Sequence, residues 1–439
     1  METILDWGER LAAWLDRRVT AGRARAYGLI FLVCGGLFYV AAPLLFAPLR
    51  HGAPILGDYL ARYTAGRFVL AETASRLYEV GAQEAFQQRA AAAGDYLSLF
   101  VSPPFSALIY LPLALLPYTP SALLWLACSL TLLLVAAALI RPLVPRLGAR
   151  WSLVLVVAAG AQPTLELLGG GQDSALALLL WIGGVRLAVA RRDGAAGLVF
   201  ALGLFKPQLF FLAPLIFLGL RRWRSLASWA ATARGLALAS LAVVGPSGVL
   251  AWLDLLRSPL YRSAAQDGQA WKMQSLSALT RSLVPARFGG GAELAGVALG
   301  LVLAGGCALV VWRMRDLTAP REALVWGFAA ITTFLAAPHV LIYDMVVLLP
   351  AILVLLERTN TRPVRLALVA LAFLTWSSLL RNGFFGALPW PLDALGASWG
   401  ALPLLALWFV QRRLLAAPTV ERAAAELRQP RTQALTFPS

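Results

Sequence analysis

The feature that most constrains this chain is a series of about a dozen apolar runs, many of them close to the roughly 20 residues that cross a bilayer as a helix. Hydrophobic residues make up 59% of the 439 and charged residues only 14%, whereas a typical soluble domain has about 25% charged residues. A membrane-spanning chain must satisfy its own backbone hydrogen bonds, in helices or in a closed barrel. Barrel strands alternate apolar and polar residues, and runs such as Leu130 to Ile140 lack that alternation. The sequence therefore predicts an all-α polytopic integral membrane protein.

The formal net charge of +16 is concentrated in short arginine clusters between the apolar runs rather than in a continuous basic stripe. This pattern indicates cytoplasmic anchoring of a membrane protein and not a nucleic-acid partner. If all the clusters are cytoplasmic, the chain from Arg150 onward forms a series of outward-reaching helical hairpins. The clusters are Arg141/Arg146/Arg150, Arg191/Arg192, Arg221/Arg222/Arg224, Arg313/Arg315/Arg321, Arg358/Arg362/Arg365 and Arg412/Arg413.

The chain reads as a single membrane domain over residues 1–439, with about 11 to 13 membrane segments. Residues 1–25 form an amphipathic cytoplasmic N-terminus, and residues 413–439 form a cytoplasmic tail. The stretches 50–102 and 249–290 are polar enough to be extracytoplasmic loops. We expect the amphipathic helices of the first, long loop to lie along the membrane interface.

Two segments do not look like simple spans. Pro103 to Tyr118 is short and rich in proline, so we expect it to enter the membrane only partly, which requires a cover of protein or water. Ala195 to Leu220 is interrupted by Lys206-Pro207. A single helix would bury the lysine at mid-membrane at a cost of several kcal/mol, so we expect two short helices that meet at Lys206 near the outer face.

Ionisable side chains near membrane spans are candidates for function because their burial is expensive. Asp58 follows the first span and could accept a proton from a hydroxyl, although it also fits an ordinary helix N-cap. Lys206 stands at a helix break, where an ammonium group could bind a phosphate; the alternative is a lysine that extends to the interface.

Four further candidate residues lie on the expected outer side. Gln172 and Asp173 follow a run of three glycines at a tight turn, where they could bind a sugar or simply cap the next helix. His339 and Asp344 flank the expected kink at Pro338, and a histidine there could neutralise a phosphate or serve only as an interfacial side chain. The other histidine, His51, has no recognisable context. No zinc signature, phosphate-binding loop or dinucleotide fingerprint is present, and no cluster of acids would hold a divalent ion, so we expect neither cofactor nor metal.

Taken in order, these pieces resemble glycosyltransferase family 87, whose members are integral-membrane enzymes of the GT-C structural class. The resemblance extends over about residues 55 to 356 and depends on the order and placement of short motifs. These are Asp58-Tyr59 leading into Tyr63-Thr64-Ala65-Gly66, Ser102-Pro103-Pro104-Phe105, Gly171-Gln172-Asp173-Ser174, Lys206-Pro207-Gln208, and Pro338-His339 followed by Tyr343-Asp344. The chain departs from the family pattern at Asp173, where a small or amide residue is usual.

The resemblance implies a GT-C-like bundle that transfers a hexose, with mannose favoured, from a polyprenyl-phosphate donor to a hydroxyl of a glycolipid or glycan, with inversion at the sugar. Asp58 would be the general base, and Lys206 and His339 would bind the donor phosphate. Tyr63, Gln172, Asp173, Tyr343 and Asp344 would bind substrate. The implied location is the cytoplasmic (inner) membrane of a bacterium, surrounded by membrane lipids, with the site facing the periplasm or the exterior.

Two other classes of function remain open at this point. A transporter or flippase of a lipid-linked or phosphorylated substrate would also have a broken helix, but the chain shows no internal repeat and its candidate residues gather at one face. A structural subunit of an envelope complex would tolerate replacement of Asp58. A test in detergent, with both substrates in one compartment, separates an enzyme from a transporter.

Overall fold

The computed structural model describes residues 2–46, 54–91, 96–263, 267–314, 317–397 and 399–417. The chain is 81% helical, and no strand occurs among these residues; an isolated β-bridge joins Met273 to Leu341. The first part of the chain forms α1 (Glu2–Arg18), α2 (Ala21–Gly35), η1 (Gly36–Ala41), α3 (Ala42–Leu45), α4 (Tyr59–Leu70), η3 (Ala74–Arg76), α5 (Val80–Ala91), η4 (Pro104–Tyr110), α6 (Leu111–Ala114) and α7 (Tyr118–Ile140).

The central part continues with helices that are shorter and more often interrupted, apart from α15, which bends at Gly245-Pro246. They are η5 (Arg141–Leu143), α8 (Pro145–Gly148), α9 (Trp151–Ala159), α10 (Gln162–Gly170), α11 (Ser174–Val189), α12 (Asp193–Leu202), η6 (Gly203–Phe205), α13 (Pro207–Phe210), α14 (Ala213–Gly219) and α15 (Trp223–Arg257). The first residues of the predicted second loop, 249–257, thus continue α15.

The last part of the chain begins with the short helices of the second predicted loop and returns to longer ones. It contains α16 (Pro259–Tyr261), η8 (Asp267–Lys272), α17 (Leu276–Ser282), η9 (Ala286–Phe288), α18 (Gly289–Arg313), α19 (Ala319–Ala336), η10 (Ile342–Leu348), α20 (Leu349–Arg358), α21 (Arg362–Trp376), α22 (Ser378–Phe385), η11 (Asp393–Gly396) and α23 (Ala401–Ala416).

Four helical stretches are long and apolar enough to cross a membrane, and there are up to six if the bent pairs α9–α10 and α21–α22 each count as one span. At most 28% of the apolar window in each of the four is buried in protein. Their outward faces carry large apolar side chains such as Phe38, Leu301 and Val302, which are 59%, 62% and 70% exposed. Apolar surface on this scale requires lipid. The prediction of an all-α polytopic membrane protein is confirmed. Four further apolar helices have only 10–17 residues. The 11 to 13 expected membrane segments therefore include pieces that are too short to span as single straight helices.

The protein core is centred on α19, in which every residue from Glu322 to Ala336 is buried. Large aromatic side chains fill the space around it: the Phe200 and Trp326 rings stack with centroids 4.3 Å apart, and Trp181 and Phe217 meet Trp326 edge-on. A second cluster joins α4, η4 and α7 through Tyr59, Tyr110 and Trp125. These two clusters fix the helices that carry the polar residues described below.

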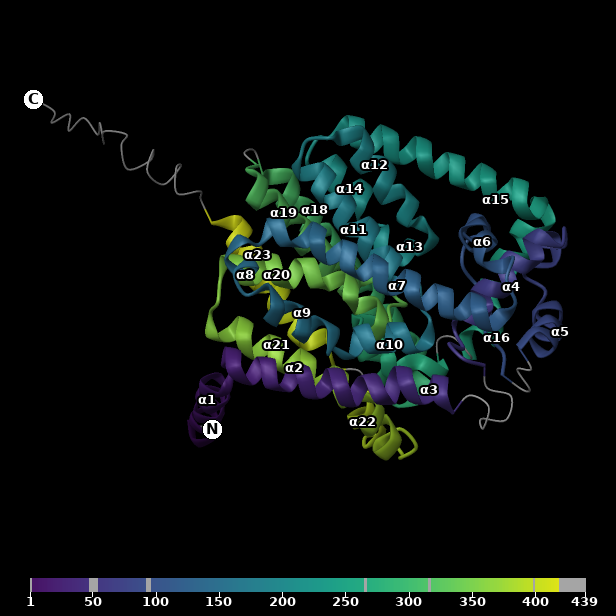
Figure 1. Ribbon diagram of the computed structural model, residues 1–439. Helices are drawn as coiled ribbons and strands as arrows, with labels where there is room; N and C mark the ends of the chain where they lie inside the picture. The colour runs from purple at the N-terminus through teal and green to yellow at the C-terminus, as the bar shows by residue number, and fades with distance from the viewer. Residues whose placement is uncertain are drawn as a thin grey trace, which may run out of the picture.

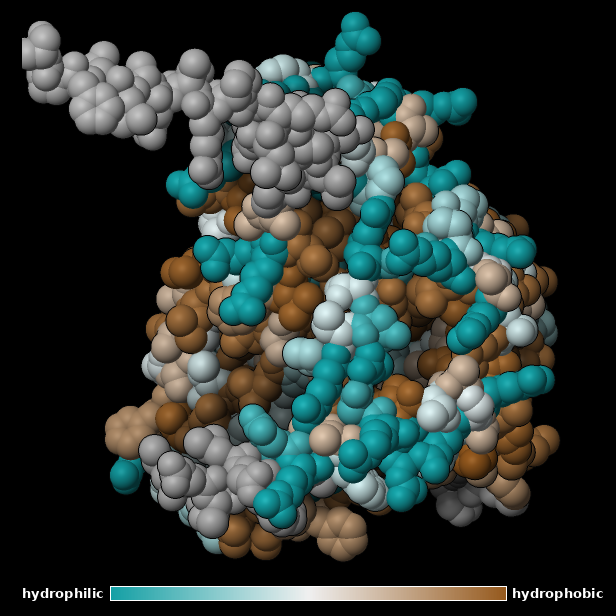
Figure 2. Space-filling model, turned by 90° about the vertical axis from the view of Figure 1, so that its left-hand side faces the viewer, coloured by the Kyte–Doolittle hydropathy of each residue, from teal (hydrophilic) through white to brown (hydrophobic). Residues whose placement is uncertain are grey.

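The arginine clusters contact one another at one end of the molecule. Arg191 donates a hydrogen bond to Leu317 O, Arg321 donates to Leu415 O, and Arg146 donates to Glu357 O. In Figure 1 this end, with α1, α8 and α23, lies at the left, and α4, α5, α6 and α16 lie at the right. Figure 2 views the left-hand end, and hydrophilic residues cross the middle of that face. The clusters therefore share one side, as predicted; Arg315 and most of the tail 413–439 lie outside the described residues.

The two unusual segments both contain short helices, as expected, while their depth in the membrane stays a prediction. Three residues separate the helical run Pro104–Ala114 from α7. At 11 residues, the run reaches no more than about 22 Å even at the 2.0 Å rise of a 3₁₀-helix, which is less than the bilayer core. The segment Ala195 to Leu220 is divided at Lys206 into α12–η6 and α13–α14. Lys206 has non-helical backbone angles, φ −124° and ψ 73°, because a residue that precedes proline is driven out of the α region.

The prediction of interfacial helices in the first loop is wrong for α4. Eight of its residues are buried, on all sides of the helix, and it packs against η4 and α6. Gly66 makes this close packing possible, since a Cβ there would lie 2.8 Å from the Ala114 Cβ. A helix enclosed in this way can present functional side chains to the interior of the protein.

Candidate functional site

Asp58 and Arg62 begin the site at the N-terminus of α4. Asp58 occupies the N-cap position but makes no side-chain capping bond, so its half-buried carboxylate is available for other contacts. Arg62 lies one turn later on the same face of the helix and donates from Nη1 to the Asp58 backbone oxygen at 2.7 Å. Gln172 donates from Nε2 to Asp58 Oδ2 at 2.7 Å.

The three glycines before Gln172 explain how α10 can end beside Asp58. Gly171 closes α10 in the left-handed region with φ 71°, which glycine adopts without strain. A Cβ on Gly170 would lie 2.8 Å from Asp58 Oδ2, and one on Gly169 would overlap the backbone oxygen of Tyr39 in η1. The tight turn and the close backbone approach predicted for this run are confirmed.

Lys206 is buried at its helix break, with 5% of its surface exposed. Its Nζ lies 2.8 Å from Asp173 Oδ1, 2.7 Å from Asp344 Oδ1 and 2.8 Å from Ser174 Oγ. An ammonium group has three donors, and these contacts use all of them. Lys206 can therefore bind a phosphate directly only if it gives up one of these partners.

Asp173 is the most extensively bound acid of the group. Arg62 donates to it from Nε at 3.1 Å and from Nη2 at 3.2 Å, and the Tyr110 hydroxyl donates at 2.8 Å. Burial by itself would raise the pKa of Asp173, but the charges of Arg62 and Lys206 outweigh it and hold the pKa well below its ordinary value. Asp173 therefore carries a negative charge at neutral pH. Its contacts with Arg62 and Lys206 connect α4, the start of α11 and the helix break at Lys206.

Asp344, Tyr343 and His339 close the site from the segment after α19. Asp344 Oδ1 accepts from Ser174 Oγ at 2.6 Å as well as from Lys206, and the Tyr343 ring centroid is 5.1 Å from Lys206 Nζ. His339 is half-buried, and its Nδ1 has no hydrogen-bond partner among the described residues. Burial lowers the pKa of His339 despite the nearby charge of Asp344, so its imidazole is neutral at neutral pH.

The structure thus brings Asp58, Gln172, Asp173, Lys206, Tyr343, His339 and Asp344 to one region. Tyr63 is not part of it: its hydroxyl donates to Leu116 O at 2.9 Å, and its ring packs against Tyr118. Position 63 faces a different side of α4 from Asp58 and Arg62. His51 lies outside the described residues. No group of three metal-ligating side chains occurs in the described ranges, and the expected independence from metal stays a prediction.

Sequence reasoning missed Arg62, Ser174 and Tyr110. Arg62 had a detectable signal, because it stands four residues after Asp58 and such residues share a helical face. Ser174 stands in one of the motifs quoted above but was given no role, and Tyr110 had no signal, since the contacts of both depend on elements that meet only in the fold. Charge is nearly balanced in the cluster: two cations, Arg62 and Lys206, face three carboxylates. Asp173 and Asp344 compensate the cations, which leaves Asp58 as the carboxylate in excess.

Fold and site together define a polytopic α-helical membrane protein with a buried charged site at the end opposite its arginine clusters. The family model for glycosyltransferase family 87 matches residues 100–338, more than half of the 439 residues, and the chain belongs to this family of glycosyltransferases. Gln172, Asp173 and Lys206 lie within the matched range, whereas Asp58 and Arg62 precede it and Asp344 follows it. No curated protein and no solved structure matches the chain significantly.

Proposed function

We propose that this protein is an inverting hexosyltransferase that moves a sugar, mannose first among the candidates, from a polyprenyl-phosphate donor to a hydroxyl of a glycolipid or glycan. The observation that carries the proposal is the position of Asp58. One oxygen is held by Gln172, and the neighbouring cluster of Arg62, Asp173, Lys206 and Asp344 is balanced in charge. A carboxylate oriented in this way suits proton removal.

In the proposed reaction, the acceptor oxygen attacks the anomeric carbon from the face opposite the phosphate. As the new C–O bond forms, the acceptor proton passes to Asp58, and the bond from the anomeric carbon to the phosphate oxygen breaks with its electron pair. The products are the inverted glycoside and a lipid phosphate. Because the phosphate departs as an anion, the reaction needs no second carboxyl group as acid.

For the donor phosphate, the hydrogen bonds of Lys206 favour an electrostatic role. Its charge, with that of Arg62, would offset the negative charge that develops on the leaving group in a buried setting. Direct contact requires an exchange in which the phosphate replaces Ser174 or a carboxylate. His339 would contribute a hydrogen bond rather than charge, because its imidazole is neutral and its Nδ1 has no partner among the described residues. Tyr343 and Asp344 are placed to contact the donor beside them.

We place the enzyme in the cytoplasmic membrane of a bacterium, with residues 1–25 and 413–439 on the inside and the site on the outside. The grouping of the arginine clusters at the other end supports this orientation through the excess of basic residues in cytoplasmic loops. We also propose that transfer needs no metal, so that a chelator leaves the rate unchanged.

The test is an assay of purified protein with polyprenyl-phosphate sugars, using a mixed membrane-lipid extract as acceptor, with and without EDTA. Asp58→Asn keeps an oxygen that can accept from Gln172, so it should fold, but it cannot take up the proton. We expect a loss of about 10² to 10⁴-fold in turnover, with no change for Asp254→Asn, a substitution at an exposed site in α15.

Equal turnover in Asp58→Asn and the parent would remove Asp58 from the role of base. If the parent turns over none of the donors, the proposed donor class is wrong. Loss of turnover on chelation would show that the metal-free mechanism is wrong.

A further inference from the structure

A second ion pair, between a buried acid and a half-buried lysine, lies near Asp58 and has no role in the mechanism above. Glu166 in α10 is 7% exposed, and its Oε1 lies 2.5 Å from Nζ of Lys272 at the end of η8. The chain has only two lysines, and each pairs with buried acids. An ionisable residue inside a broken membrane helix is costly and typical of a functional position.

The position of Glu166 is fixed by the helix that ends at Asp58. Glu166 stands four residues before Gly170, so both lie on the same face of α10, and a Cβ on Gly170 would lie 2.8 Å from Asp58 Oδ2. The Asp58 and Glu166 carboxylates are close enough to interact electrostatically. The ion pair is therefore about one helical turn from the proposed base, on its α10 side.

Apart from Lys272, the groups that contact Glu166 and its neighbour Gln162 are uncharged and polar. Gln162 Nε2 lies 3.1 Å from the Tyr39 hydroxyl, 3.5 Å from Glu166 Oε2 and 3.5 Å from Ser378 Oγ. Gln162 is fully buried, yet its Oε1 has no partner among the described residues. An acceptor atom buried without a partner is destabilising. A hydroxyl-rich ligand would supply the missing donor.

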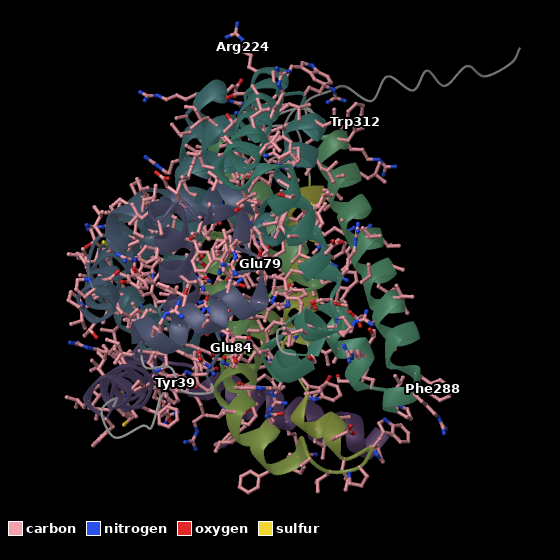
Figure 3. The ribbon with its side chains drawn as sticks, turned by 90° about the vertical axis from the view of Figure 1, so that its right-hand side faces the viewer. Tyr39, Glu79, Glu84, Arg224, Phe288 and Trp312 are labelled. Atoms are coloured by element: carbon pink, nitrogen blue, oxygen red, sulfur yellow. The ribbon has the colours of Figure 1, made fainter. Side chains whose placement is uncertain are left out.

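Lys272 is held in place by a short connection to the other wall of the site. Gln274 N donates to Val340 O at 3.1 Å, and the bridge between Met273 and Leu341 follows the same segment. The Trp271 ring centroid is 5.0 Å from Lys272 Nζ. The ion pair thus joins α10 to the segment that carries His339 and Asp344, with an indole at its edge. Figure 3 shows the end of the molecule that carries α4 to α6, with Tyr39 near its lower left edge.

We infer that Gln162, Glu166 and Lys272 bind the hydroxyl groups of the acceptor sugar and present one of them to Asp58. The inference rests on the proposed function, because it assigns the acceptor to the α10 side of the same base. Glu166 would accept from sugar hydroxyls, Lys272 would donate to them, and Gln162 would use its free oxygen. Binding sites for small polar ligands combine a few convergent polar groups with aromatic surface. Here a carboxylate, an amide and an ammonium group lie beside an indole.

The experiment measures two fates of a mannose-labelled polyprenyl-phosphate donor: transfer to a mixed membrane-lipid extract and release to water. Water needs no acceptor subsite. Glu166→Gln and Lys272→Met should each reduce transfer to lipid by about ten- to a hundredfold, as expected for one hydrogen bond to a charged group, and leave release to water within about twofold of the parent.

Glu322→Gln is the matched control. It breaks another buried ion pair, with Arg222, in the first turn of α19 and thus at the end of the helix remote from His339. It should lower thermal stability without changing the ratio of transfer to release.

An equal fall in transfer and release for both variants would overturn the inference. It would mean that the ion pair stabilises the fold or belongs to the donor site. Unchanged transfer in both variants would overturn it as well. If the parent consumes no donor at all, the proposed function fails first, and that result differs from either of these.

Discussion

At the scale of single residues, the site is governed by how completely each charge is compensated. Lys206 uses its three donors on Asp173, Asp344 and Ser174, so in the proposed reaction it would provide positive charge rather than a vacant hydrogen-bond donor for the phosphate. Asp173 lies against both Arg62 and Lys206 and compensates their charges. Asp58 is left with a carboxylate that no cation of the described site binds directly.

Asp173→Asn should therefore be far more damaging to stability than Asp58→Asn. The substitution leaves Arg62 and Lys206 buried with too few carboxylates, and removing one partner of a buried pair costs about 3–5 kcal/mol. The measurement is the midpoint of thermal unfolding in detergent, with Asp58→Asn as the comparison at the same site. A midpoint equal to that of Asp58→Asn would mean that Asp173 does not hold the cluster together.

At the scale of elements, the site is made by helices that stop where another element comes close. The three residues at the end of α10 are glycines, and larger side chains there would collide with Tyr39, Asp58 and Leu56. The next helix, α11, then begins beside Lys206, which contacts Asp173 and Ser174. The helix break before Pro207 allows the Lys206 side chain to reach these partners. Short and broken helices thus replace straight spans wherever a polar group must reach the interior.

Gly170→Ala tests this close approach. The added methyl group would lie 2.8 Å from Asp58 Oδ2, so it should displace the carboxylate and reduce sugar transfer at least about tenfold, a loss of 1.4 kcal/mol in transition-state stabilisation. Alanine favours the helix over glycine by up to about 1 kcal/mol, so the fold should persist. Gly194→Ala, where no atom lies within 4 Å of the new Cβ, is the control and should leave transfer unchanged. Full activity of Gly170→Ala would show that Asp58 need not occupy this position.

At the scale of the whole molecule, the two ends have different charged groups. One end joins arginine clusters with acids of neighbouring helices, as in Arg222 with Asp193 and Glu322 and Arg365 with Asp16. The other end contains the enclosed α4 and the proposed catalytic cluster. Lipid-facing apolar side chains cover the helices between them. We therefore propose that the arginine clusters of the first end orient the molecule and that the second end carries the active site.

This orientation can be measured by labelling single cysteines with a membrane-impermeant maleimide in intact cells. Starting from Cys34→Ser and Cys128→Ser, which remove the two cysteines that are not fully buried, we expect Glu84→Cys to react from outside. Arg224→Cys should react only after the membrane is permeabilised. Both residues are exposed and are labelled in Figure 3. The opposite pattern would place the site on the cytoplasmic side.

Much of the architecture followed from local patterns that act over a few residues. The apolar runs predicted the membrane helices, Lys206-Pro207 predicted the break, and three successive glycines predicted the close turn before Gln172. These predictions succeeded because bilayer thickness, the missing amide hydrogen of proline and the freedom of glycine act on the chain directly. The arginine clusters likewise indicated which loops share one side.

The partners within the site were decided by the tertiary structure. Sequence alone made Lys206 a free phosphate ligand, Tyr63 a substrate contact and α4 an interfacial helix. Packing instead surrounds Lys206 with two carboxylates, directs Tyr63 to Leu116 and encloses α4. The sequence by itself determined the membrane class and the helix breaks, and it identified most of the polar residues of the candidate site. Only the fold decided which of them meet, because the Coulomb energy of a buried pair depends on distances between residues more than 100 positions apart in the chain, such as Arg62 and Asp173.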